Sequence, residues 1–279
     1  MFAIIPFYPP FSLTVFDIPL DSWSLLVALG FVVGIEFARA RAQQLGIRVA
    51  DVVDGGLFIV GMGFVVGHFV HVGVYNPQMI DQYGWSIFLQ VWAGFSSNGG
   101  FVGAILGTWL WFTHIRKRTP FWKYADTMAY SLPFGWFFGR LGCFSAHDHI
   151  GQRSDFFLAV DFPAIYYGGP RHDLGLYEAL WVFCLAIFHF SLRKRTLPHS
   201  TFAMIFCFAY APVRFGLDFL RNTDLSGADV RFLGLTPAQY GSLMFLACGI
   251  VLFMRRHKEG RYFEDSTTEL SGSEPNQAD

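Results

Sequence analysis

The chain has 279 residues, of which 53% are hydrophobic, 19% aromatic and only 15% charged. Soluble domains carry about 25% charged residues, so this composition argues against a soluble protein. The net charge of −1 conceals a strong segregation of charge along the chain. The four cysteines have no CxxC spacing, and three of them lie inside apolar segments, where cysteine behaves as a small hydrophobic side chain.

Apolar stretches of about 17 to 25 residues, long enough to cross a bilayer, recur along the chain. The loops around residues 39–48, 116–123, 193–195 and 255–261 are basic and follow every second span. The positive-inside rule makes these loops cytoplasmic, with the N-terminus outside and the C-terminus inside. We expect seven spans, at Trp23–Phe37, Val52–Val72, Gly94–His114, Tyr124–Leu141, Leu176–Leu192, Thr201–Leu217 and Pro237–Met254.

The predicted fold is therefore an all-α integral membrane domain over residues 1–263, with about seven transmembrane helices. The loop Gly142–Gly175 is rich in Gly, Pro, Asp and aromatic residues and is expected to form a small periplasmic head above the bundle. Residues 264–279 are rich in Ser, Thr, Glu and Gly, which predicts a disordered cytoplasmic tail.

The basic residues outside the cytoplasmic loops are all arginines. Arginine recognises phosphate in a bidentate manner, whereas lysine acts as a compact point charge. Arginines without lysines on the outer side therefore suggest recognition of an anionic headgroup, although pairing with neighbouring carboxylates is an alternative. These residues are Arg140, Arg153, Arg171, Arg214, Arg221 and Arg231.

The stretch Gly139–Gly151 combines an arginine at the end of an apolar segment with three glycines and several ionisable residues. An arginine at membrane depth is costly unless it faces a partner or a water-filled cavity, and glycines allow close approach of the backbone to a ligand. The stretch is typical of the floor of a site, although a snorkelling arginine at an ordinary helix end is the alternative.

Three further clusters are predicted to converge on the same side. Asn98-Gly99-Gly100 follows two serines at the start of the third span, where it could cap the helix or approach a ligand. Tyr177 and Glu178 lie in the first turn of the fifth span, where Glu also suits the helix dipole. The third cluster shares one helical face at the end of the sixth span and could form a structural triad or a phosphate clamp: Arg214, Asp218 and Arg221.

A zinc site could be drawn from loop residues that include two histidines in H-x-H alternation. Such alternation in a loop is weak evidence for a metal without a second pair of ligands, so we expect neither a metal nor another cofactor. The residues concerned are Cys143, His147, His149 and His172.

The order and spacing of these motifs resemble the prolipoprotein diacylglyceryl transferase family over most of the chain. The resemblance rests on Ser97-Asn98-Gly99-Gly100, on Gly139-Arg140-Leu-Gly142 ending at Gly151, and on Arg171-His172 followed by Leu176-Tyr177-Glu178. It continues through Val213-Arg214-Phe215, Asp218-Phe-Leu-Arg221 and Leu235-Thr-Pro-Ala-Gln239. The resemblance implies a multi-pass protein of the bacterial inner membrane.

Members of this family transfer a diacylglyceryl group from phosphatidylglycerol to the lipobox cysteine of a preprolipoprotein, and glycerol 1-phosphate leaves. The implied partners are therefore phosphatidylglycerol, the preprolipoprotein lipobox segment and membrane lipids, and no nucleic acid. The resemblance implies that Arg140 and Arg214 bind the lipid phosphate, with support from Asp218 and Arg221. The other implied substrate-binding residues are Asn98, Gly99, Gly100, Cys143, Gly151, Tyr177 and Glu178.

The sequence departs from the family pattern at several of these positions. Asn98 stands where the family usually has His, and Cys143, Ala146 and Asp148 replace Asn, Asn and Glu. One hypothesis is that His147 or His149, paired with Asp148, supplies a general base from the loop. The alternatives are a divergent paralogue with a different acceptor and a non-catalytic protein that binds phospholipid.

Overall fold

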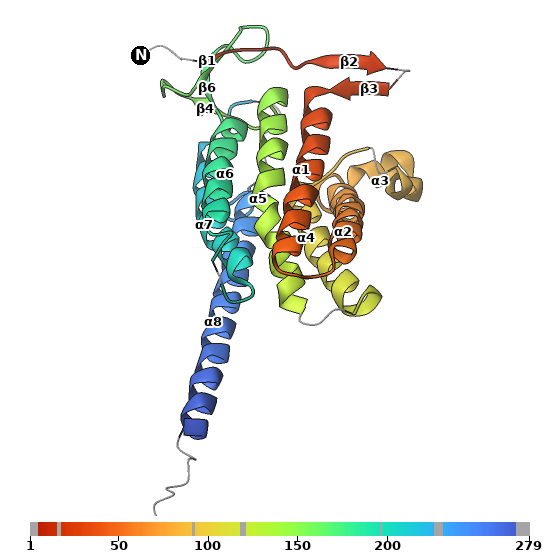
Figure 1. Ribbon diagram of the computed structural model, residues 1–279. Coiled ribbons are helices and arrows are strands. Elements are labelled where there is room, and N and C mark those ends of the chain that lie inside the picture. The colour runs from red at the N-terminus through yellow and green to blue at the C-terminus, as the bar shows by residue number, and fades with distance from the viewer. Residues whose placement is uncertain are drawn as a thin grey trace, which may run out of the picture.

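The computed structural model describes residues 5–15, 18–90, 93–117, 121–195, 197–225 and 231–271, with residues 15, 18, 19 and 256–271 described by their backbone alone. Within these residues the chain forms a bundle of long helices with a small sheet at one end (Figure 1). The long helices are α1 (Ser22–Gln44), α2 (Val49–Val70), α4 (Ser97–Leu110), α5 (Phe121–Ala146), α6 (Leu174–Ser191), α7 (Thr201–Leu217) and α8 (Pro237–Ser271).

Five helical segments are long and apolar enough to cross a membrane, which makes the chain a multi-pass membrane protein in outline. The predicted spans at Gly94–His114 and Tyr124–Leu141 fall on α4 and α5. These two helices are not among the segments that are both long and apolar enough to cross a membrane. The α4 helix has 14 residues, and α5 carries buried charged residues that lower its hydropathy. The five segments are Ser22–Gln44, Val49–Tyr75, Leu174–Ser191, Thr201–Leu220 and Pro237–Arg255.

Short elements extend several of these helices. A π-helix, η1 (His71–Tyr75), continues α2, and another, η3 (Trp111–Ile115), continues α4. The connection between α2 and α4 contains α3 (Gln78–Tyr83) and the 3₁₀ helix η2 (Trp85–Leu89), and a further 3₁₀ turn, η4 (Asp218–Leu220), ends α7.

The head contains strands, which the sequence analysis did not predict. The strands β1 (Ile5–Pro6), β5 (Val160–Phe162), β6 (Gly169–Asp173) and β4 (Ile150–Arg153) form one sheet in this order. The β1–β5 pair is parallel, and the other two pairs are antiparallel. A separate hairpin of β2 (Ser12–Val15) and β3 (Ile18–Asp21) leads into α1, whose first turn is capped by Asp21.

Glycines bring the helices of the bundle close together. A Cβ atom at Gly30 of α1 would lie 2.6 Å from the carbonyl oxygen of Gly135 of α5, and the reverse distance is the same. A Cβ atom at Gly99 of α4 would lie 2.7 Å from Val70 of α2 and 2.9 Å from Gly67. Small residues at such crossings allow backbones to approach in a membrane, where helix association depends on packing.

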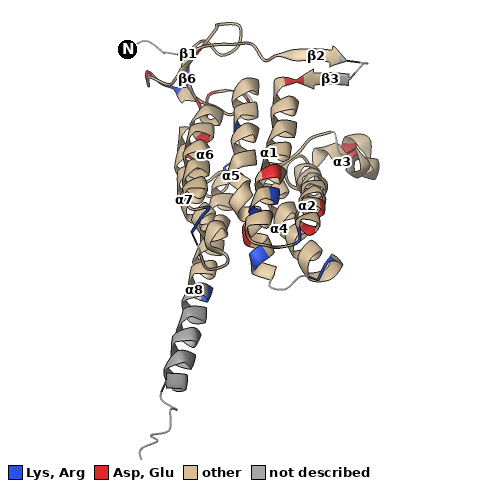
Figure 2. Ribbon diagram, in the orientation of Figure 1, with Lys and Arg blue, Asp and Glu red and all other residues tan. Residues whose placement is uncertain are grey.

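Figure 2 shows few charged residues along the middle of the bundle and several at the end opposite the sheet, near the α1–α2 and α6–α7 connections. Arg118 and the basic side chains beyond Arg255 lie outside the described part of the chain. The α8 helix continues to Ser271, and residues 272–279 are not described, so the disordered tail from Glu264 stays a prediction.

Candidate functional site

One buried carboxylate joins two buried arginines at the centre of the site. Glu178, in the first turns of α6, lies 2.8 Å from Nε of Arg140 on α5 and 2.6 Å from Nη1 of Arg214 on α7. The exposed fractions are 3% for Arg140, 1% for Glu178 and 7% for Arg214. Because charges are costly to bury without partners, the carboxylate holds both guanidinium groups in place.

Further contacts fix the guanidinium group of Arg140. Its Nη2 donates to the hydroxyl of Tyr210 at 3.2 Å, and that hydroxyl donates to Glu178 at 2.9 Å. The guanidinium carbon lies 4.7 Å from the ring centroid of Trp136, one turn earlier on α5. Nη1 points to the other side, 3.7 Å from Sγ of Cys143 and 3.4 Å from Nε2 of His149.

Asp218 completes the surroundings of Arg214. Its Oδ1 lies 3.3 Å from Nη1 of Arg214, one helical turn earlier, and its Oδ2 accepts a hydrogen bond from the hydroxyl of Thr236. The backbone N–H of Thr236 donates to Oε1 of Gln239 at 3.0 Å, and Gln239 Nε2 donates to the carbonyl of Phe215. This chain of contacts links the end of α7 to the start of α8.

A cavity of about 210 Å³ opens beside this cluster. Residues from α4, α5, α7 and α8, from η1 and from the head contribute to its walls. Arginine side chains supply positive charge, and the first turns of α4 and α8 supply small and polar side chains. The lining residues are His71, Tyr75, Phe95, Ser96, Ser97, Asn98, Phe101, Arg140, His149, Tyr210, Arg214, Arg221, Pro237, Ala238, Gly241, Ser242 and Phe245.

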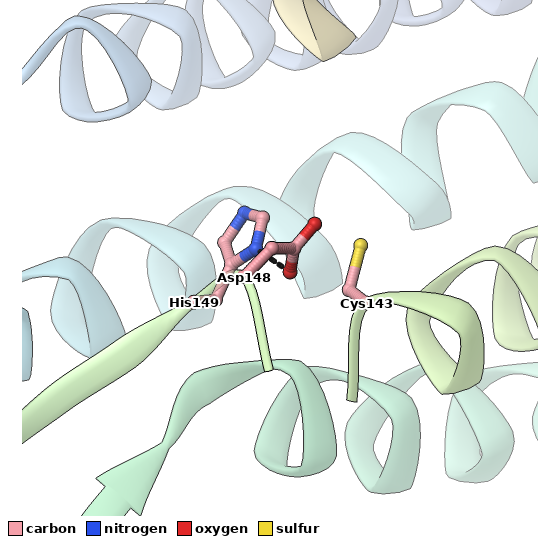
Figure 3. A group of neighbouring side chains, drawn as sticks. All are labelled: Cys143, Asp148 and His149. Atoms are coloured by element: carbon pink, nitrogen blue, oxygen red, sulfur yellow. Dashed lines mark hydrogen bonds and ion pairs between the residues drawn. The ribbon is translucent and has the colours of Figure 1, made fainter. Parts of the chain in front are cut away.

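The head contributes one imidazole to the cavity. Figure 3 shows the ring of His149 beside the carboxylate of Asp148, with the thiol of Cys143 close by. Nδ1 of His149 forms a short hydrogen bond with Oδ1 of Asp148. Burial lowers the pKa of His149, but its side-chain hydrogen bonds to Asp148 and Cys143 outweigh burial and raise the pKa to about 9.

The Asp148–His149 pair is therefore an imidazolium–carboxylate pair at neutral pH. Burial raises the pKa of Asp148, but the hydrogen bond and the charge of His149 lower it overall. The contact between His149 Nε2 and Arg140 is long, at 3.4 Å. The short bond from Nδ1 to Asp148 therefore has the larger influence on the protonation of the ring. The cavity thus gains another positive group.

The two histidines of the H-x-H pair occupy different surroundings. Nδ1 of His147 lies 2.7 Å from Asp173, and Nε2 lies 3.1 Å from the carbonyl oxygen of Tyr8. The ring of His147 stacks on Phe7 with centroids 5.0 Å apart. His147 is absent from the lining of the described cavity and fastens the head to the N-terminal segment.

Several residues implied by the family resemblance contact protein groups. The hydroxyl of Tyr177 lies 2.9 Å from Nδ1 of His172. Ser96 caps α4 by accepting from the N–H of Gly99, and Gly100 packs against the ring of Phe95. Gly151 pairs with Arg221 in an isolated bridge, where a Cβ atom would lie 2.6 Å from the carbonyl oxygen of Leu220.

Asn98 lies on the cavity wall and is held by its amide group. Its Nδ2 donates to the hydroxyl of Tyr75 at 2.8 Å and lies 3.4 Å from the carbonyl oxygen of Pro237. The site residues that sequence reasoning missed are Tyr210 and Tyr75. For His71, three residues after His68 near the end of the second span, the sequence favoured a packing or interfacial role, whereas the structure places it on the cavity wall. Tyr210 precedes Arg214 by one helical turn and therefore lies on the helical face that Arg214 and Asp218 share. The same spacing could have indicated Tyr210 as a site residue.

Comparison with known proteins shows the family of this chain. Residues 10–255 match the model of a family described as prolipoprotein diacylglyceryl transferase. The chain belongs to this family. Among curated relatives named phosphatidylglycerol–prolipoprotein diacylglyceryl transferase, the protein from Solidesulfovibrio magneticus is 29% identical over 265 residues, covering 90% of this chain and 96% of the relative.

Two other relatives with the same name support the assignment. The protein from Nitratidesulfovibrio vulgaris (strain Miyazaki F) is 30% identical over 263 residues, covering 90% of this chain and 94% of the relative. The protein from Pasteurella multocida is 34% identical over 226 residues, covering 78% of this chain and 82% of the relative. The family assignment therefore spans the whole cavity.

We expect Glu178→Gln to destabilise this family member strongly, because Arg140 and Arg214 would lose the carboxylate that compensates them both. Breaking a buried ion pair costs about 3–5 kcal/mol. Thermal unfolding in detergent micelles would measure the loss. The matched control is Glu36→Gln, which breaks the exposed Glu36–Arg39 pair on α1 and should leave the unfolding temperature unchanged. Equal unfolding temperatures for the two variants would contradict the assigned role of Glu178.

The stabilisation contributed by His149 should depend on pH. Its pKa rises from 6.5 to about 9 on folding, so its contribution is complete below about pH 6.5 and is lost as the pH rises toward 9. The difference in unfolding temperature between the wild type and His149→Gln should therefore be largest at pH 6 and shrink by pH 9.5.

His172 provides the matched control for this measurement. Burial lowers its pKa, so the contribution of His172 should be present at high pH and be lost as the pH falls. Because this loss occurs below the ordinary pKa of 6.5, the difference for His172→Gln should stay nearly constant from pH 6.5 to 9.5. A difference for His149→Gln that stays constant from pH 6 to 9.5 would refute the imidazolium–carboxylate pair.

Proposed function

We propose that this protein transfers a diacylglyceryl group from phosphatidylglycerol to the lipobox cysteine thiol of preprolipoproteins. A thioether forms and glycerol 1-phosphate leaves. The observation that carries this proposal is the pair of arginines, Arg140 and Arg214, held by one carboxylate on the wall of a cavity. Family membership and the names of the relatives support it.

The proposed arrangement in the membrane has seven spans, with the N-terminus outside and the C-terminus in the cytoplasm of a bacterial cell. The α4 and α5 helices would complete the five apolar helices, with the sheet in the periplasm. Basic loops near the α1–α2 and α6–α7 connections favour this orientation. The cavity would then lie at the outer leaflet of the inner membrane, within reach of both lipid and the lipobox segment.

Arg140 and Arg214 would bind the phosphate of the lipid. Arginine N–H groups fixed before the substrate arrives need no reorganisation as negative charge develops on the leaving phosphate. Arg221 lines the same cavity and would add to this charge, and Asp218 would keep Arg214 in position. The imidazolium of His149, held by Asp148, would face the same phosphate and neutralise it as it departs.

Other cavity residues would position the lipid. Asn98 would contact the headgroup from α4, and Tyr177, Gly99, Gly100 and Gly151 would shape the packing around the site. Cys143 stands next to Arg140 and Asp148, where its side chain would tune the environment of His149. His147 would act indirectly, by holding the head over the bundle through Asp173 and Tyr8.

Asn98 favours a second candidate function. An amide cannot accept the proton of a thiol at neutral pH, and its Nδ2 is already engaged with Tyr75. A protein with the lipid-binding arginines but without a base would bind anionic phospholipid and transfer nothing. A transfer assay separates the two candidates.

Transfer of labelled diacylglycerol from phosphatidylglycerol to a lipobox peptide should fall at least about 100-fold in Arg140→Ala and in Arg214→Ala, because each removes a donor to the developing charge. Arg153→Ala is the matched control, since Arg153 lies exposed on β4 and should retain full transfer. Full activity in both cavity variants would overturn the assigned site. Absence of transfer by the wild type, with binding of phosphatidylglycerol that depends on Arg140, would favour the second candidate.

A further inference from the structure

The cavity contains a second imidazole, His71, that none of the roles above employs. It is the first residue of η1, the π-helix that extends α2. Tyr75, at the other end of η1, lines the cavity too and accepts the hydrogen bond from Asn98. The end of α2 and the start of α4 therefore form one polar wall.

The surroundings of His71 favour the neutral ring. Nδ2 of Asn76, which can only donate, lies 3.2 Å from Nε2 and 3.5 Å from Nδ1 of His71. Among the described residues no carboxylate forms an ion pair with His71. The arginines that line the same cavity disfavour a further positive charge on the ring. A neutral imidazole carries one unprotonated nitrogen.

The backbone makes room for the ring of His71. Gly94 has φ of +143°, and a Cβ atom there would lie 2.1 Å from Nε2 of His71. A side chain at position 94 would therefore occupy the place of the imidazole. By contrast, His68 is fully buried with each ring nitrogen 2.9 Å from a carbonyl oxygen, of Gly94 and Ile87, and does not line the cavity.

The two cavity imidazoles consequently differ in charge. His149 is held as a cation by Asp148 beside Arg140, in the phosphate-binding part of the site, and a protonated ring cannot take up a proton. We propose that His71 is the general base that deprotonates the acceptor thiol. This inference rests on the proposed function and adds to it the residue that takes the proton.

The step balances as a displacement at carbon. The S–H proton of the acceptor cysteine passes to a ring nitrogen of His71, and the thiolate sulfur attacks the glyceryl carbon that carries the phosphate oxygen. The S–C bond forms as the C–O bond breaks. The electron pair of the C–O bond goes to the phosphate oxygen, whose charge is met by the guanidinium groups of Arg140 and Arg214.

Few ionisable groups share the cavity with His71. These groups are tyrosine hydroxyls and positively charged side chains. Each positive charge in the cavity disfavours protonation of His71 and so favours its neutral ring. His68 lies one turn earlier on the same helix, outside the lining of the cavity. The other titratable or charged residues that line the cavity are Tyr75, Arg140, His149, Tyr210, Arg214 and Arg221.

The test is the pH dependence of transfer by His71→Gln, with phosphatidylglycerol and a lipobox peptide. At pH 7 we expect a loss of about 100-fold or more, because the thiol must ionise unaided. The rate of the variant should then rise about tenfold per pH unit toward the thiol pKa of about 8.5, approaching the wild-type rate. Binding of phosphatidylglycerol should not change.

Two further variants keep the inference testable whatever the stability of His71→Gln. His71→Ala should recover activity when imidazole is added to the assay, because the removed ring leaves a space beside Gly94. His68→Gln is the matched control from the same helix, and its pH profile should keep the shape of the wild-type profile.

The inference fails if His71→Gln retains wild-type activity at pH 7, or if its rate falls by the same factor at every pH and imidazole restores nothing in His71→Ala. Failure of the proposed function looks different. In that case the wild-type protein itself yields no thioether at any pH, whereas failure of the His71 assignment leaves an active wild type.

Discussion

The site depends on one carboxylate placed between two arginines. Glu178 compensates Arg140 and Arg214 in the interior of the bundle, where two like charges would otherwise repel each other and lose their hydration. Asp218 adds a second carboxylate beside Arg214, so the two arginines are compensated within the protein. Arg140, Arg214 and Arg221 all line the cavity, and this gathering of guanidinium groups on its wall suits an anion.

The fold serves this arrangement by joining elements far apart in the sequence. The α5, α6 and α7 helices each supply one member of the cluster, and the head returns His149 to the same place. Thr236 binds Asp218 and ties α8 to the end of α7. Because Asp173 both caps α6 and binds His147, the head and the helix that carries Glu178 are fixed together.

The sequence allowed the chemistry to be predicted better than the geometry. The contrast between arginines in loops predicted to be outer and lysines in loops predicted to be cytoplasmic pointed to Arg140 and Arg214, and hydropathy indicated the bundle. The pairing of Glu178 with both arginines could not be predicted, since it requires three helices to meet. Nor could His147 and His149 be told apart, because their difference arises from the distant residues Asp173 and Tyr8. The sequence placed His71 beside His68 near the end of a span, where packing was the expected role, and only the cavity distinguishes the two histidines.

The most direct test of the account is an experimental structure of the protein bound to phosphatidylglycerol. We expect the lipid phosphate inside the cavity, within hydrogen-bond distance, about 2.7–3.2 Å, of guanidinium nitrogens of Arg140 and Arg214. The ion pairs of both arginines with Glu178 should persist in the complex. A phosphate bound elsewhere, with the Arg140–Glu178–Arg214 cluster untouched by lipid, would contradict the central claim.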